Sequence, residues 1–220
     1  MDSKIGLQFI FYICTYAPNS VFQKNIQTIP SILNRSDATF YNFSIGSNPD
    51  LTNVIALCRG DVGVTRCRSC LGVAYNQLTT KCANEKESIM WRDECMLRYS
   101  DRGIFNKINT FFSNAFAFDK NLAADANEFN KKVRSLLDRL QEKAAAGTSL
   151  LKLNTGNISI TDNTTVHGLA QCTPDLTAMQ CKDCLDEAFA YLPTCCDGKR
   201  GGRVVMPSCN FRYGTGLPLL

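Results

Sequence analysis

The chain has 220 residues, of which 45% are hydrophobic and 20% charged, the mixture of an ordinary globular protein with one or two domains. Its net charge is only +4 and its basic residues are scattered, so the composition does not favour nucleic acid as a partner. No stretch approaches the roughly 20 apolar residues of a transmembrane helix, so we expect no membrane span in this chain. The unusual feature is the count of 12 cysteines.

The chain starts with MDSKIGLQFIFYIC, in which Lys4 precedes an apolar run over Ile5–Ile13. That run is short for the hydrophobic region of a signal peptide, and no clean small-residue cleavage site follows it. We predict that the segment is the first strand of a folded module, and a signal remnant is the alternative. On either interpretation we expect the signal peptide to be degenerate or missing from this sequence.

Regular elements follow in order. Apolar residues at i, i+4, i+7 and i+11 predict an amphipathic helix over Phe22–Leu33, which Pro30 should kink or shorten. A second helix is predicted over Val64–Lys81. Alternation and β-rich composition predict four strands around these helices: Phe40–Ile45, Val54–Cys58, Ile89–Glu94 and Met96–Tyr99.

Five cysteines then recur at one offset. Adding 114 to the first member of each pair gives the second: Cys58 and Cys172, Cys67 and Cys181, Cys70 and Cys184, Cys82 and Cys196, Cys95 and Cys209. Such a repeat predicts two copies of one module. We place them at residues 8–105 and 108–216, with the link near residues 101–109.

The second copy repeats the pattern. Ile108–Phe118 is predicted to open it as a strand, and a longer helix is predicted from about Asn127 to Ala146, ending at Gly147. The basic residues of this helix are interleaved with Asp138 and Glu142, which indicates a solvated face. A further helix carries the stripe from Cys181 to Leu192, and four more strands are predicted: Leu150–Leu153, Thr165–Gln171, Arg203–Met206 and Asn210–Tyr213.

The predicted fold class is therefore α+β. Each of two tandem modules should be an antiparallel sheet packed by about two helices and cross-linked by disulfides.

The even cysteine count favours a disulfide framework in an oxidising, extracellular compartment. Four Asn-x-Ser/Thr sequons agree with that compartment as glycosylation sites: Asn34, Asn42, Asn157 and Asn163. Zinc and a thioredoxin-like redox pair are the competing uses of Cys-x2-Cys. Zinc needs about four clustered ligands, whereas each copy has a single Cys-x2-Cys and the chain has one histidine, His167.

Structural disulfides are thus the favoured interpretation, with no metal or cofactor. Cysteines three apart on a helix, such as Cys67 and Cys70, point in similar directions and should each reach a different strand. Catalysis has little support, because His167 lies in a strand-like run and no nucleophile motif or phosphate-binding glycine loop is present. We predict a protein that is not an enzyme.

The Cys-x8-Cys-x2-Cys spacing, the segment DECMLRYS and the segment LPTCCDGKRGGRVVMPSCNFRY resemble the plant stress-antifungal domain, the module homologous to ginkbilobin. That domain occurs in tandem in cysteine-rich receptor-like kinases, plasmodesmata-located proteins and cysteine-rich repeat secretory proteins. The resemblance covers nearly the whole chain. Its disulfide pattern, transferred to this sequence, implies five bonds: Cys14–Cys82, Cys58–Cys67, Cys70–Cys95, Cys172–Cys181 and Cys184–Cys209.

The second copy departs from this pattern. The position equivalent to Cys14 is near Asn121, so Cys196 loses its implied partner, and an extra cysteine, Cys195, precedes it. Three states remain open for this adjacent pair: a bond between the two, two free thiols, or a bond to a partner chain.

The family's antifungal member binds mannose through three polar residues. In the first copy the matching positions hold Thr15, Ile89 and Ser100, and in the second they hold about Leu122, Arg203 and Gly214. Only Arg203 keeps the required type, so mannose binding is disfavoured and Arg203 is a weak sugar-contact candidate.

The resemblance implies a secreted, apoplastic binding module in plant stress or defence signalling, with an unknown extracellular protein or cell-wall glycan as its partner. A mannose-type antifungal lectin, a truncated ectodomain of a cysteine-rich receptor-like kinase, and a thiol redox sensor are the alternatives.

Overall fold

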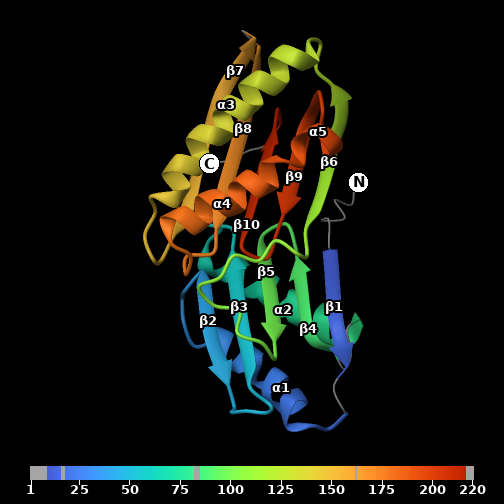
Figure 1. Ribbon diagram of the computed structural model, residues 1–220, viewed down its shortest axis with the longest axis vertical. Helices are drawn as coiled ribbons and strands as arrows, with labels where there is room; N and C mark the ends of the chain where they lie inside the picture. The colour runs from blue at the N-terminus through green and yellow to red at the C-terminus, as the bar shows by residue number, and fades with distance from the viewer. Residues whose placement is uncertain (1–8, 16–17, 82–84, 162, 217–220) are drawn as a thin grey trace. The chain divides into compact units, whose positions relative to one another are not determined.

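The computed structural model describes residues 9–15, 18–81, 85–161 and 163–216, with β1 described by its backbone alone. The chain divides into two compact units, Met1–Phe105 and Asn106–Leu220. Each unit contains one five-stranded sheet whose neighbouring strands are all antiparallel, together with helices that pack on it (Figure 1). The predicted α+β class is therefore confirmed.

The first unit has the strand order β1-β4-β5-β3-β2. Its elements along the chain are β1 (Phe9–Thr15), α1 (Val21–Leu33), β2 (Phe40–Ile45), β3 (Thr52–Cys58), α2 (Val64–Lys81), β4 (Glu85–Trp91) and β5 (Cys95–Ser100).

The second unit has the order β6-β9-β10-β8-β7, which is the same arrangement with each strand replaced by its repeat. Its elements are β6 (Asn114–Leu122), α3 (Ala126–Ala145), β7 (Lys152–Thr161), β8 (Thr164–Cys172), α4 (Ala178–Phe189), α5 (Leu192–Cys195), β9 (Lys199–Val205) and β10 (Cys209–Gly214). Helices α3 and α4 lie across one face of this sheet (Figure 1).

Alternation along the strands explains how the cores form. In β3 every second residue, namely Val54, Ala56 and Cys58, belongs to the hydrophobic core under the helices. The apolar stripe of α1 completes that core with Phe22, Ile26, Ile29 and Leu33, and α3 does the same in the second unit. Side chains that point to one face of a strand repeat every two residues, and those of a helix every three or four, so the two patterns meet in a single layer.

Several predicted boundaries were wrong. The strand predicted at Leu150–Leu153 is β7, which runs on through polar and small residues to Thr161. It is an edge strand, and an edge tolerates side chains that composition alone assigns to a loop. The first strand of the second unit is Asn114–Leu122, later than the predicted Ile108–Phe118. Helix α1, by contrast, ends at Leu33 as predicted, and Pro30 does not shorten it.

Pro193 accounts for one local difference between the units. Helix α2 is one continuous helix of 18 residues, whereas the matching stretch of the second unit is split into α4 and α5 by Ala190 and Tyr191. Proline has no N–H to donate to the carbonyl four residues earlier, and its ring clashes with that carbonyl. That carbonyl belongs to Phe189, the last residue of α4, so the first helix has to end there.

Candidate functional site

Disulfide bonds fix the helices over both sheets. In the first unit Cys58 bonds Cys67 and Cys70 bonds Cys95, and in the second unit Cys172 bonds Cys181 and Cys184 bonds Cys209. The two cysteines of each helical Cys-x2-Cys thus reach two different strands. Cys14 lies in β1, whereas Cys82 lies outside the described residues, so the bond implied between them stays a prediction.

The adjacent cysteines of the second unit, Cys195 and Cys196, are bonded to each other. Cys195 ends α5, and Cys196 begins the turn that leads into β9. Cys196 is almost fully buried, whereas Cys195 is only partly buried. A Cβ placed on Gly202 would lie 2.8 Å from the Cys196 Sγ and 2.8 Å from a Tyr213 ring carbon, so this close packing requires glycine.

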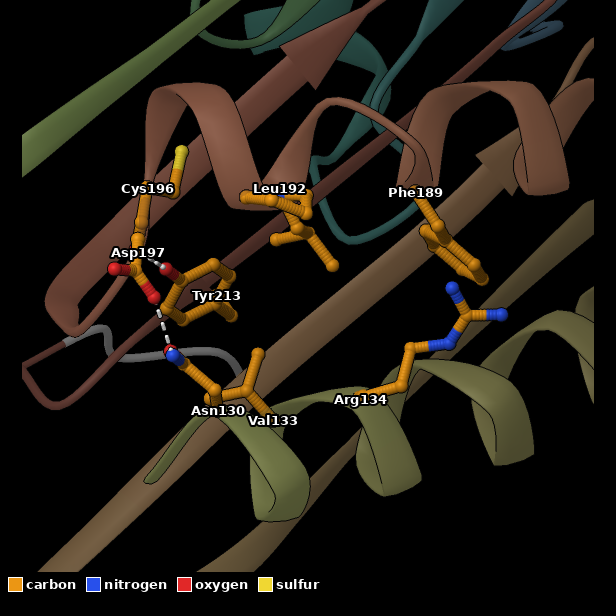
Figure 2. Close-up of a pocket in the computed structure, with 9 residues that line it drawn as sticks. Asn130, Val133, Arg134, Phe189, Leu192, Cys196, Asp197 and Tyr213 are labelled. Atoms are coloured by element: carbon orange, nitrogen blue, oxygen red, sulfur yellow. Dashed lines mark hydrogen bonds between the residues drawn. The ribbon is translucent and has the colours of Figure 1, made fainter. Parts of the chain in front are cut away.

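A pocket of about 210 Å³ opens beside this disulfide, where α4 gives way to α5. Its floor is apolar and buried, whereas its rim is partly or fully exposed and combines polar with apolar side chains (Figure 2). The floor consists of Val133, Phe189, Cys196 and Tyr213, and the rim includes Asn130, Arg134, Leu192, Pro193 and Asp197. The break that Pro193 imposes on the helix therefore coincides with the pocket.

One end of the pocket carries an amide and a carboxylate. The Asn130 side-chain amide donates to the Asp197 carboxylate at 2.6 Å, and its carbonyl accepts from the Gly198 backbone N–H at 2.9 Å. Gly198 has φ +63°, a conformation that favours glycine at this turn. These contacts connect α3 to the turn after α5 and orient the Asp197 carboxylate at the rim.

The other end carries a cation. The Arg134 guanidinium lies over the Phe189 ring (Figure 2), 5.0 Å from its centroid. Its Nε donates to the Asp138 carboxylate at 2.7 Å. A guanidinium over an aromatic face is attracted by the ring quadrupole. Because ring and carboxylate both hold Arg134, the guanidinium is positioned at the rim although half of its side chain is exposed.

Tyr213 lies beside Asp197 at the first of these ends (Figure 2). Its hydroxyl donates to the backbone carbonyls of Cys196 at 3.2 Å and Lys199 at 3.1 Å. Burial of the ring, and then the nearby Asp197 carboxylate, raise the pKa of this phenol above its ordinary value, since both disfavour the phenolate. Tyr213 is therefore a neutral floor residue that holds the turn carrying the disulfide.

Comparison with known proteins identifies the family. The sequence model of the family described as salt stress response/antifungal matches residues 13–102 and 115–216. The chain belongs to this family. Over 212 residues it is 37% identical to cysteine-rich repeat secretory protein 38 of Arabidopsis thaliana, with 93% of this chain and 83% of that protein covered. It is also 38% identical over 207 residues to an antimicrobial ginkbilobin-2-like protein of Castanea crenata, covering 93% and 85%.

A solved structure shows the same fold. The tandem DUF26 ectodomain of the Arabidopsis thaliana cysteine-rich receptor-like protein PDLP8 superposes with a TM-score of 0.81 at 24% identity, over 97% of this chain and 99% of that one. Relatives in this stress-antifungal family are secreted proteins and extracellular ectodomains, so the extracellular compartment predicted from the cysteines is confirmed. None of the helices in the described part of the chain is long and apolar enough to cross a bilayer.

The positions that match the family's mannose contacts lie elsewhere in the structure. In the first unit Ile89 and Ser100 are fully buried in β4 and β5. In the second unit Leu122 is 64% exposed at the end of β6, and Arg203 is buried in β9. Gly214 has no side chain to contribute. The register places Arg203 opposite Phe116 and Arg212, and none of the three matching positions lines the pocket.

The structure also shows where His167 and the four sequon asparagines lie. His167 is half-buried in β8, opposite Asn157 and Gly214. All four sequon asparagines are exposed: Asn34, Asn42, Asn157 and Asn163.

Several pocket residues escaped the sequence interpretation. Arg134 was assigned to the solvated face of α3 together with its basic neighbours, yet its guanidinium lies over Phe189 at the pocket rim. Asn130 and Asp197 are separated by 67 positions, and only the folded chain brings them together. One signal was available, because Pro193 stands where the first copy has Thr79 and predicts a break in the repeated helix.

Proposed function

We propose that this member of the stress-antifungal family is a non-catalytic extracellular recognition module of plant stress or defence signalling, and that its second unit contacts the partner through the pocket. The observation that supports this most directly is the arrangement of the pocket. An apolar floor lies between an Asp197–Asn130 end and an Arg134–Phe189 end. Binding sites combine apolar surface with a few placed polar groups in this way.

The size of the pocket limits what it receives. Its volume of about 210 Å³ is below the roughly 300–1,000 Å³ of sites that enclose whole drug-sized ligands. It suits one projecting group of a larger partner, either a side chain of an extracellular protein or one ring of a cell-wall glycan. Its polar ends are already positioned by Gly198 and Asp138, which lowers the entropic cost of ordering them upon binding.

Arrays of cell-wall oligosaccharides and of plant receptor ectodomains, probed with the labelled full chain, test this function. Hits are then titrated against Arg134→Gln, which installs the residue type of the equivalent Gln27. We expect at least a tenfold loss of affinity, because the positioned guanidinium is removed from the rim. Arg139→Gln is the matched control, since it removes the same charge from the same helix at an exposed residue outside the pocket lining.

Three results would count against the proposal: no binding on either array, equal losses with both variants, or binding that survives Arg134→Gln unchanged. A mannan hit abolished by Arg203→Ala but unaffected by Arg134→Gln would instead support the lectin alternative.

A further inference from the structure

Each five-stranded sheet ends in strands that pair on only one side. Among the strands that the structure describes, β1 and β2 in the first unit and β6 and β7 in the second each pair with one neighbour only. An unpaired strand edge exposes a row of backbone N–H and C=O groups to which another chain can add a strand. Proteins usually block such edges with charged residues, proline, bulges or very short strands.

Strand β6 carries two of these protections. Asp119 and Lys120 place charges on it, and its pairing with β9 shifts register twice, which marks irregularities in the edge.

Strands β2 and β7 lack such protections in their own sequences, and the charges at β7 come from α3, where Lys132 and Arg139 donate to backbone carbonyls at residues 157–160. The β2 sequence FYNFSI has no charge and no proline. The β7 sequence KLNTGNISIT has no proline and one charged residue, Lys152. That lysine is buried, and its Nζ donates to the carbonyls of Ala145 and Gly147. Its charge is therefore not available at the edge of the strand to repel an incoming strand. Uncharged, β-rich segments of this kind are those that associate when exposed.

Both strands instead carry a sequon near their middle, at Asn42 in β2 and Asn157 in β7. Both asparagines are exposed. The register places Asn42 opposite Ile55 and Asn157 opposite His167. Ile55 and His167 each come directly after a core residue, Val54 and Val166 respectively, and successive residues of a strand point to opposite faces. The two side chains therefore leave their strands on the face opposite the helices, where a large substituent meets no core residue.

We propose that Asn42 and Asn157 carry N-linked glycans that prevent strands of other molecules from pairing with β2 and β7. In the glycosylation reaction, the side-chain amide nitrogen of asparagine attacks the anomeric carbon of an oligosaccharide carried on a polyprenyl diphosphate. The N–C bond forms as the C–O bond to the diphosphate breaks, and the amide loses one proton. A bulky, hydrated glycan on an edge strand then occupies the space that an incoming strand needs. This inference is independent of the pocket and of its proposed ligand.

The remaining two sequons supply the matched control. Asn34 follows the last residue of α1, and Asn163 lies in the turn between β7 and β8. Both are exposed as well, but neither lies within an edge strand. Loss of their glycans changes the carbohydrate mass of the protein without uncovering the middle of either strand.

The experiment compares full-length chains secreted from plant cells. Glycopeptide mass spectrometry reports which asparagines are modified, and size-exclusion chromatography with light scattering reports association as protein concentration rises. We expect glycans on Asn42 and Asn157 in the wild type. The double variant N42Q/N157Q should form at least fivefold more oligomer than wild type at the same concentration, whereas N34Q/N163Q should match wild type.

A rescue variant separates edge pairing from misfolding. N42K/N157K also lacks both glycans but puts a charge on each edge, and it should restore the monomer. If N42Q/N157Q fails to fold, the wild type treated with an endoglycosidase under native conditions answers the same question. Unmodified Asn42 and Asn157, equal association in the two double variants, or no rescue by lysine would each overturn the proposal.

Discussion

The two units have the same cross-linked scaffold but different surfaces above it. Each joins its second helix to two strands through bonds that span 9 and 25 residues. Each also packs an aromatic residue of its first helix against a tyrosine of its last strand. The ring centroids are 6.4 Å apart for Phe22 and Tyr99, and 6.3 Å apart for Phe129 and Tyr213. The repeat therefore preserves both the covalent frame and the packing beneath the helices.

The difference lies where the second unit has its pocket. Thr79 continues helix α2, whereas Pro193 at the same repeat position ends α4 and allows α5 to begin. Around this break the first unit's Gln23 and Gln27 are replaced by Asn130 and Arg134. Two copies of a domain can thus keep the same scaffold while only one of them has a polar pocket rim. The disulfides hold the strands and helices together whatever the rim residues are.

Removing a shared disulfide should give the largest effect, and it should be the same in both units. Replacing Cys70 and Cys95 with alanine, or Cys184 and Cys209, opens a loop with a sequence separation of 25 residues in either case. The chain-entropy model then gives a loss of about 3.5 kcal/mol in the free energy of unfolding of that unit. Hydrogen exchange of core amides, followed by mass spectrometry, reports each unit separately.

The unaltered unit of each variant serves as its internal control. Losses that differ by more than about 1 kcal/mol between the two variants would show that the scaffolds are not energetically equivalent.

Periodicity and cysteine spacing were sufficient to predict the scaffold. The stripes of α1 and α3 and the repeat of Cys-x8-Cys-x2-Cys are local signals, and each requires only neighbouring residues. Edge strand β7 was underestimated, because Asn154, Gly156 and Asn157 resemble a loop in composition but are in register with β8 on one side. The pocket was not predictable in this way, since Asn130, Asp197 and Tyr213 meet only after α3, α5 and β10 have packed.

Tyr213→Phe should give the second largest effect and should single out the second unit. The variant loses the two hydrogen bonds to the turn carbonyls, at a cost of about 1.5 kcal/mol. Because burial raises the pKa of this phenol, the folded state keeps it neutral while the unfolded state ionises near the ordinary pKa of 10.0. The stability that the hydroxyl contributes is therefore complete below pH 10 and is lost as the pH rises toward the folded-state pKa.

Urea denaturation of wild type and Tyr213→Phe between pH 8 and 11 measures this difference. The advantage of the wild type should be constant up to pH 10 and should then shrink by up to about 1.4 kcal/mol over the next pH unit. Asp197→Asn removes the second cause of the shift and so lowers the folded-state pKa of the tyrosine; the decline should still begin near pH 10 but should level off at a lower pH than in the wild type. A difference between wild type and Tyr213→Phe that stays constant up to pH 11 would contradict the buried, neutral phenol.

Loss of the bond between Cys195 and Cys196 should have the smallest effect on stability and a local one on structure. A loop of two adjacent residues removes little chain entropy, so the double variant Cys195→Ala/Cys196→Ala should lose only about 1 kcal/mol. Since Cys196 packs against Gly202 and Tyr213 and lines the pocket, amide chemical shifts should change for Gly198, Gly202 and Tyr213 and remain unchanged in the first unit. A loss near that of the Cys184–Cys209 bond, or shifts spread through both units, would mean that this pair belongs to the shared scaffold. A small, local response would instead place it with Pro193 among the features that distinguish the second unit from the first.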